Sequence, residues 1–298
     1  MSPTSRPSMT LAALRYPFLA ASLAVAACSS QQDDITVPVV APDTTSPGGI
    51  YIGQNNTQSG AAATTVIALL DQTSRMEIYS SDGGSLLSGL YSTTTTNGFS
   101  AQARSFALGS SSSSSSSSGS SSSSSSSSGS SSSSGATPPT VNLVGSFAAE
   151  SQILASYAGT DGTGGSYNLT YQTTFYQVPS TLATLAGTWV VQDAFGATIS
   201  SFSIDGGGGI SGTTTTPVCT YSGNASIIDL RFNLYGLSLN ESCTSAGSSG
   251  GSTATTATLN GLATLLPASA TLGSTKKQLV LAGASASEGR LFRLNPSN

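Results

Sequence analysis

The stretch "TTVIALLDQTSRMEIYSSDGGSLLSGLYS", residues 64–92, decides the fold. It contains three short runs rich in β-branched, aliphatic and aromatic residues, and turn-forming residues separate them. Polar and apolar positions alternate within the runs, which is typical of β-strands with one buried face. Asp82-Gly83-Gly84 stands between the second and third runs and favours a tight reversal. The stretch therefore predicts three consecutive antiparallel strands.

Similar runs continue in both directions along the chain. "GIYIGQ", residues 49–54, comes before the stretch, and a second series extends from "GTWVVQD" at residue 187 to "GRLFRLN" at residue 289. Each series contains about eight short runs bounded by turn signals. Helical periodicity is hard to find, and the best candidate is "STLATLAG" at residue 180, as a short connector.

We therefore expect an all-β protein with two tandem domains, at residues 49–178 and 179–298. Eight short antiparallel strands close naturally into an up-and-down barrel, because closure pairs every strand edge. A two-sheet sandwich is the alternative for either domain, since the number of strands does not distinguish the two architectures.

The two domains share a short sequence pattern. "YSSDGGSLLSG", residues 79–89, and "FSIDGGGGISG", residues 202–212, align without a gap and share the Asp-Gly-Gly triplet at Asp82 and Asp205. The neighbouring strands align poorly in the same register. We interpret the match as similar turn chemistry in two hairpins, with gene duplication as the alternative.

Two segments have low complexity. Residues 28–48 are polar and interrupted by prolines, and residues 109–137 are almost entirely serine with a few glycines. Neither can bury enough apolar surface to form a core. We expect the first to be a flexible tether, with a reach of roughly 60 Å, and the second to be a flexible loop inside the first domain.

Residues 1–27 have the features of a secretory signal peptide. Arg6 and Arg15 are followed by an apolar run that ends in small residues. The run is shorter than the roughly 20 residues that a transmembrane helix needs. Its end, Val25-Ala26-Ala27-Cys28, resembles the lipobox of bacterial lipoproteins. The alternative is an ordinary signal peptide that happens to contain a cysteine.

The lipobox resemblance implies that Cys28 carries fatty acyl chains such as palmitate and becomes the first residue of the mature protein. In that family an Asp just after the Cys favours the inner membrane, whereas Ser29 and Ser30 stand here. The resemblance therefore implies an anchor in the bacterial outer membrane. Two or three acyl chains would hold the protein there essentially permanently.

A second resemblance concerns the barrels. "LAGTWVV", residues 185–191, resembles the first strand of lipocalin-like barrels. The order of a lipidated Cys, a tether and an eight-stranded barrel also resembles the surface-exposed barrel lipoproteins of Gram-negative bacteria. These resemblances imply either surface display or the carriage of a small apolar ligand inside a barrel.

Composition excludes several kinds of function. The formal net charge is −4, and Lys and Arg do not cluster, which does not suit nucleic-acid binding. The chain has no histidine, which excludes Ser-His-Asp and Cys-His catalysis and the HExxH zinc site. We expect no enzymatic activity, no cofactor and no metal.

Two cysteines remain once Cys28 is set aside, and an even number in an exported protein favours a disulfide. Cys219 and Cys243 flank a sequence that reads as two strands folding back near Asp229 to Arg231. Closing a loop of about 25 residues would stabilise the fold by roughly 3–3.5 kcal/mol. Free or metal-binding thiols are the alternative.

Other candidate sites are better explained by structure. Gly247–Gly251 fits G-x-S-x-G and Ser274–Lys277 fits S-x-x-K, but neither has the strand and helix context that the chemistry needs. Paired carboxylates could hydrolyse glycosides, yet nothing brings two of them into one cleft. The candidates are Asp71, Glu77, Asp82, Glu150, Asp161, Asp193, Asp205, Asp229, Glu241 and Glu288.

A set of aromatic residues offers an apolar lining or simple packing. Its members are Tyr167, Tyr171, Phe175, Tyr176 and Trp189. Such residues more often fill a small barrel than line a cavity. We expect a lipid-anchored, non-enzymatic interaction or structural module with an unidentified protein partner; the alternative is a carrier of a small apolar ligand.

Overall fold

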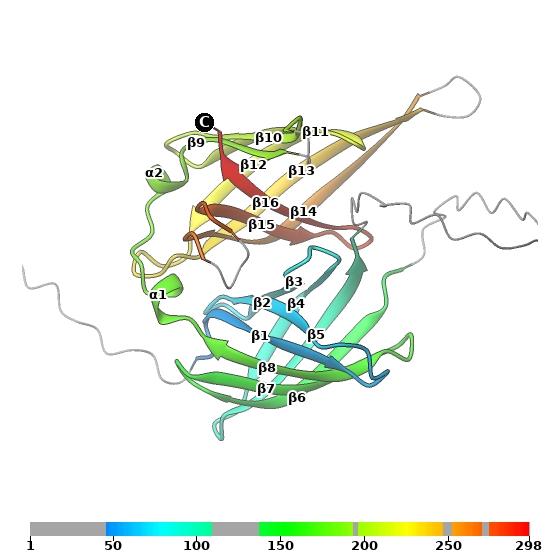
Figure 1. The fold of residues 1–298 in the computed structure, drawn as a ribbon, viewed down its shortest axis with the longest axis vertical. Helices are drawn as coiled ribbons and strands as arrows, with labels where there is room; N and C mark the ends of the chain where they lie inside the picture. The colour runs from blue at the N-terminus through cyan, green and yellow to red at the C-terminus, as the bar shows by residue number, and fades with distance from the viewer. Residues whose placement is uncertain (1–45, 109–136, 193–195, 247–251, 270–273, 298) are drawn as a thin grey trace, which may run out of the picture. The chain divides into compact units, whose positions relative to one another are not determined.

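The chain forms two closed antiparallel barrels of eight strands each (Figure 1). This computed structural model describes residues 46–298 except 109–136, 193–195, 247–251, 270–273 and 298. The all-β prediction and the barrel prediction are confirmed, and the two-sheet sandwich is wrong. Closure leaves no free sheet edge along most of each barrel, and this pairing of strand edges is the reason for which we expected barrels.

Barrel 1 contains the first eight strands in chain order, each paired with the next. They are β1 (Gly49–Thr57), β2 (Thr64–Leu70), β3 (Arg75–Ser80), β4 (Ser85–Thr93), β5 (Gly98–Ala107), β6 (Thr140–Ala148), β7 (Gln152–Gly159) and β8 (Gly164–Tyr171). β1 and β8 close the barrel, with Tyr51 opposite Tyr171. The predicted serine-rich loop lies outside the described residues, but it joins β5 and β6, which are paired neighbours.

Barrel 2 contains the other eight strands in the same up-and-down order. They are β9 (Gly187–Gln192), β10 (Thr198–Ile204), β11 (Gly209–Thr215), β12 (Val218–Ile227), β13 (Tyr235–Ala246), β14 (Ser252–Leu266), β15 (Gln278–Ala284) and β16 (Gly289–Pro296). β16 returns to β9 to close the barrel, and this contact is short, with Asn295 opposite Val190 and Pro296 opposite Trp189.

Two short helices, α1 (Thr173–Tyr176) and α2 (Leu182–Leu185), lie on the connection between the barrels (Figure 1). The expected connector at "STLATLAG" contains α2, which Thr181 caps by accepting a hydrogen bond from the Thr184 backbone. The expected boundary of the first domain at residue 178 falls between α1 and α2, and the last strand of that domain ends before it. β8 ends at Tyr171, which lies opposite Tyr51 of β1, and α1 follows.

The repeated Asp-Gly-Gly pattern forms two similar turns. Asp82 accepts a hydrogen bond from the Gly84 backbone, and Asp205 accepts from those of Gly207 and Gly209. The first turn joins the third and fourth strands of barrel 1, whereas the second joins the second and third strands of barrel 2. Because the positions in the two barrels differ, similar turn chemistry explains the match better than duplication does.

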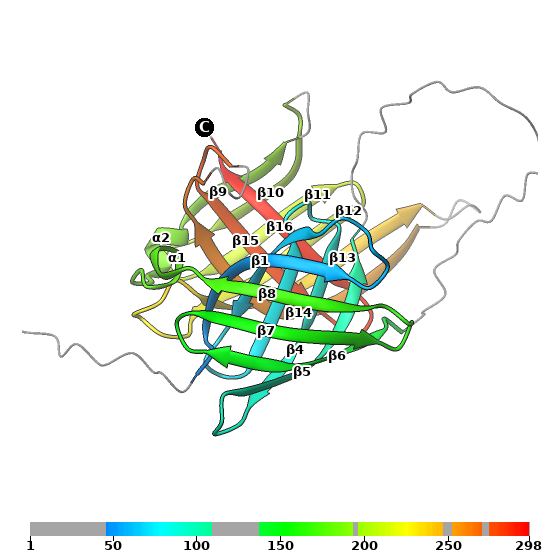
Figure 2. The same ribbon diagram turned by 60° about the horizontal axis from the view of Figure 1, so that its bottom comes forward.

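Most strands show the alternation expected of a barrel wall. In β6, Val141, Leu143 and Phe147 are buried while Asn142 and Val144 are exposed. Figure 2 shows β1, β8, β7 and β6 in order along this wall. The buried side chains therefore fill the interior of barrel 1, and the exposed ones face outward.

The strands β2, β3 and β15 depart from this alternation because nearly every residue in them is buried. The register places Ile67 and Leu69 on the outer face of barrel 1, since Ala68 between them lies opposite Tyr51 and faces inward. Both join one apolar cluster with Leu262 and Val280 of barrel 2. The barrels therefore share an apolar interface, and residues 43–298 form one compact unit.

Candidate functional site

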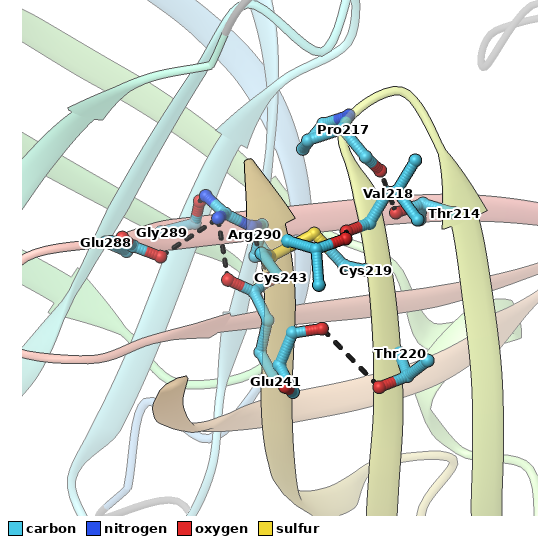
Figure 3. The surroundings of a disulfide bond; sticks show 12 residues. Thr214, Pro217, Val218, Cys219, Thr220, Glu241, Cys243, Glu288, Gly289 and Arg290 are labelled. Carbon is cyan, nitrogen blue, oxygen red and sulfur yellow. Dashed lines mark hydrogen bonds and ion pairs between the residues drawn. A yellow bond between two sulfur atoms is a disulfide. The ribbon is translucent and has the colours of Figure 1, made fainter. Parts of the chain in front are cut away.

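The predicted cysteine pair is bonded inside barrel 2. Cys219 of β12 lies directly opposite Cys243 of β13, and the two sulfur atoms form a disulfide (Figure 3). The Cα atoms are 4.0 Å apart. Both side chains are buried. The chain reverses between Ile227 and Tyr235, a segment that contains the expected turn at Asp229 to Arg231, and the register of β12 and β13 brings the two cysteines together.

An ion pair lies next to the disulfide. Arg290 of β16 donates from Nε and Nη2 to the two carboxylate oxygens of Glu241 on β13, both at 2.7 Å (Figure 3). Nη2 also donates to Glu288 at 2.9 Å. The Glu241 side chain is 2 % exposed and that of Arg290 is 29 % exposed. A paired guanidinium is the partner that a buried carboxylate needs.

The surroundings set the charges of this cluster. Burial alone would raise the pKa of Glu241, but the hydrogen bonds and the charge of Arg290, with a hydrogen bond from Tyr221, lower it below its usual value. Burial and the neighbouring Glu241 raise the pKa of Glu288. Burial, with Glu241 nearby, raises the pKa of Tyr221 to about 12. Glu241 is therefore ionised and Tyr221 is neutral at pH 7.

Two of the predicted carboxylates thus meet, contrary to the expectation that none would. Arg290 stands between Glu241 and Glu288 and bonds both, so its guanidinium holds the pair as a structural ion cluster. A carboxylate oxygen of Glu241 also lies within 4.8 Å of both cysteine sulfurs. Those sulfurs are bonded to each other, so this group does not present thiolates to a metal.

A hollow of about 500 Å³, the lateral hollow, opens beside this cluster. Its lining includes Val191 of β9 and Phe292 of β16, where the wall of barrel 2 closes through a short contact. Arg290 and Tyr221 reach it from the barrel interior, and Asp82 of barrel 1 also contributes. Charges of both signs line the hollow, so it does not select a ligand of one charge.

A second hollow, the apolar hollow, has a volume of about 370 Å³. It lies where the connection between the barrels passes the ends of β13 and β14. Its lining is mostly apolar, and Lys277 contributes an ammonium group. The main apolar contributors are Phe175, Val178, Pro179, Leu265, Leu266 and Pro267.

The predicted aromatic set does not form one cavity. Tyr167 and Tyr171 are buried in barrel 1, where Tyr167 stacks on Tyr157 and Tyr171 meets Tyr51 edge to face. Trp189 is buried in barrel 2 and donates from Nε1 to the Leu185 carbonyl at 2.8 Å. These rings fill the barrels, which agrees with the packing interpretation.

The two remaining aromatic candidates lie on α1. Tyr176 stacks on Phe232 with ring centroids 4.4 Å apart, which ties the helix to the turn before β13. Phe175 lines the apolar hollow. The sequence analysis therefore named Phe175 as a possible lining residue, but of a barrel interior and not of the apolar hollow.

Most of the other predicted acids have structural roles. Asp71 accepts hydrogen bonds from Thr73 and Arg75, and Asp229 pairs with Arg231. Asp161 accepts from Thr163 in a turn. Ser274 bonds to the backbone of Lys276 and precedes a strand, so S-x-x-K has no catalytic geometry. Cys28, Asp193 and Gly247–Gly251 lie outside the described residues.

Sequence reasoning missed the interior position of Glu241 and the burial of Glu77. Glu241 shares the parity of Leu237, Leu239 and Cys243, and this two-residue period was the signal that could have placed it inside the barrel. Glu77 is fully buried between the barrels, and its Oε2 has no partner in the described structure. No sequence signal marked it, because a polar residue at an alternate strand position normally faces water.

Comparisons with known proteins identify no relative. No protein-family model, no curated protein and no solved structure matches this chain. In the described part of the chain, no helix is both long and apolar enough to cross a bilayer.

Proposed function

We propose that this protein is a lipid-anchored, non-enzymatic interaction module of the bacterial outer membrane. The anchor is supported by the order of features at the start of the sequence, with a basic region, an apolar run and Ala26-Ala27-Cys28. The polar segment that follows Cys28 would act as the tether. The first strand of barrel 1 begins at Gly49, so a tether before it would hold the barrels away from the bilayer.

The observation that carries the interaction role is that side chains of the protein itself fill both barrels. Tyr51, Leu143 and Leu169 are buried in barrel 1, and Phe202 and Leu281 are buried in barrel 2. A ligand inside either barrel would have to displace this packing, which protein interiors resist. A carrier of the lipocalin-like type therefore has less support than a module that acts through its outer surface.

One outer face suits a protein partner. The strands β6, β7 and β8 contain no Asp, Glu, Lys or Arg. Their outward side chains are mainly hydroxyls and amides, with two large exposed apolar residues, Val144 at 63 % and Leu154 at 42 %. Interfaces are depleted of charge at their centres. We assign the partner-binding surface to this uncharged face.

The anchor is tested by metabolic labelling with an alkyne analogue of palmitate in the producing bacterium. The wild-type chain should be labelled and should fractionate with the outer membrane. The Cys28→Ala variant should be unlabelled and should leave the membrane fraction. A wild-type chain without label, or a Cys28→Ala variant that stays with the membrane, would contradict the anchor.

The interaction role is tested by crosslinking on intact cells. Val144→Asp and Leu154→Asp each place a charge on the uncharged face and should reduce the yield of the crosslinked partner at least about tenfold, as loss of a binding hot spot does. Val218→Asp is the matched control, because Val218 is 57 % exposed on barrel 2. Equal losses in all three variants would argue against this face.

A further inference from the structure

We propose that the apolar hollow binds a fatty acid, with the alkyl chain in the hollow and the carboxylate at Lys277. This goes beyond the proposed interaction role and does not depend on the anchor at Cys28. The site also lies outside both barrels, so it differs from a ligand held in a barrel interior.

The lining carries apolar surface that is open to solvent. Val178 is 44 % exposed, whereas Leu266 forms a buried part of the wall at 2 %. Phe175 is half-buried beside them. A concave, mostly apolar surface of this kind typically marks a binding site for an apolar ligand or partner. An alkyl chain laid against these residues would remove their exposed surface from water.

The polar groups in the wall are already satisfied within the protein. The side chain of Asn233 donates from Nδ2 to the carbonyls of Phe175 and Leu265, and its Oδ1 accepts from the Leu265 backbone. The Tyr235 hydroxyl bonds to Thr181 and Thr184. These groups therefore do not call for a polar ligand, and the hollow favours hydrocarbon.

The positive charge of Lys277 at the apolar hollow favours a ligand with an acidic head group. The residues that line it include Lys277 and no Asp or Glu. The Lys277 ammonium lies 5.6 Å from the centre of the Trp189 ring, in a cation–π contact that holds it in place. An exposed ammonium beside an apolar surface matches an amphiphile with an anionic head. A carboxylate is small enough to pair with the single ammonium group of Lys277, whereas a neutral lipid would form no ion pair with it.

The size of the hollow agrees with one chain. Ligand pockets usually measure about 300–1,000 Å³, and the apolar hollow is near the lower end at about 370 Å³. A second alkyl chain would not fit within the volume of the apolar hollow. We therefore commit to a single-chain fatty acid.

The binding test uses the full-length protein and a series of saturated fatty acids with 8, 10, 12 and 14 carbons, each below its micelle concentration. Trp189 is the only tryptophan in the sequence and contacts Lys277, so its fluorescence should change and saturate as the site fills. Each buried methylene should raise the affinity about fourfold until the hollow is full. No saturable change, or no dependence on chain length, would overturn the proposal.

Variants test the position of each end of the ligand. Lys277→Gln should weaken dodecanoate about tenfold by calorimetry and leave dodecanol unchanged. Lys276→Gln is the matched control, because the adjacent Lys276 does not line the hollow, and it should bind as wild type. Val178→Asp should remove binding of both ligands. Thermal unfolding should show that all three variants fold.

The carboxylate contact would be overturned if Lys277→Gln weakened dodecanol as much as dodecanoate, or weakened neither. Dodecanoate binding by Val178→Asp with wild-type affinity would place the chain elsewhere. None of these outcomes bears on acylation of Cys28 or on the uncharged face, so failure here and failure of the proposed function are separate results.

Discussion

At the scale of single residues, the two buried glutamates have opposite environments. Glu241 faces the Arg290 guanidinium, whereas Glu77 accepts one hydrogen bond from Ser88 and its other oxygen has no partner in the described structure. Burial raises the pKa of Glu77 well above its usual value, and the Ser88 hydrogen bond and the charge of Arg75 only partly oppose this. Burial against an apolar surface therefore favours the protonated form of Glu77.

This environment predicts that Glu77→Met stabilises the protein at neutral pH. The folded-state pKa of Glu77 is raised, so its contribution is most favourable below the unfolded pKa and declines as pH rises above it. Met is neutral at every pH. The stability of Glu77→Met relative to wild type should grow between pH 4 and 7, by at most about 1.4 kcal/mol per pH unit. Urea unfolding at each pH measures it, and a constant difference would contradict the prediction.

The lowered pKa of Glu241 predicts the opposite pH dependence. Its stabilising contribution is present above the unfolded pKa and is lost as pH falls through the folded one. Glu241→Gln should cost about 2–4 kcal/mol at pH 7, because Arg290 loses its buried partner, and much less at pH 3. The matched control is Glu288→Gln, whose side chain is 38 % exposed, with a cost below about 1 kcal/mol. Equal costs for the two variants would contradict this interpretation.

At the scale of elements, glycines permit the close approach of neighbouring strands. A Cβ added to Gly53 of β1 would lie 1.9 Å from the carbonyl oxygen of Asn168 on β8. A backbone oxygen in a paired strand cannot move aside without breaking the ladder. This glycine therefore lies at the closing contact of barrel 1, where Gly53 is opposite Leu169.

Gly53→Ala should accordingly destabilise barrel 1 by at least about 1–3 kcal/mol through overpacking. Gly206→Ala is the control, because nothing lies within 4 Å of a Cβ there, and it should stay within about 0.5 kcal/mol of wild type. Thermal unfolding followed by circular dichroism measures both. If Gly53→Ala unfolded at the same temperature as wild type, β1 and β8 would be able to move apart with no loss of stability, which would contradict the prediction.

At the scale of the whole molecule, the apolar interface joins two barrels that each have their own interior. Leu262 and Val280 of barrel 2 belong to the cluster that contains Ile67 and Leu69 of barrel 1. Arg293 also donates a hydrogen bond to the carbonyl of Ser81 across the interface. Because these apolar side chains are buried only when the two barrels pack together, their burial should couple the folding of the barrels.

Val280→Asp tests that coupling. Val280 is fully buried in the interface cluster, so an ionised carboxylate there would be costly. We expect the single cooperative urea transition of the wild type to separate into two, because each barrel keeps its interior. The matched control is the exposed Val218→Asp, which should keep one transition. A single transition in Val280→Asp would mean that the barrels fold together without this contact.

The sequence by itself determined most of the strands and their division into two all-β domains of about eight strands each, whereas the choice between barrel and sandwich came from the structure. These features depend on local period, turn residues and the need to pair strand edges, all of which can be read along the chain. The alternation in β6 and the turns at Asp82 and Asp205 are examples. It also indicated the pairing of Cys219 with Cys243, because the two lie on adjacent strands.

Only the tertiary structure decided what each outward or inward position meets. Leu69 and Glu77 lie on the outer face of barrel 1 and would face water in a single barrel, yet barrel 2 buries them. Arg290 and Glu241 are 49 positions apart and meet only because closure brings β13 and β16 into one interior. The apolar hollow likewise combines the connection between the barrels with the ends of β13 and β14. The alternation of polar and apolar residues predicts on which side of a strand each side chain lies. Contacts between distant segments depend on the closure of each barrel and on the packing of one barrel against the other, which no local sequence pattern encodes.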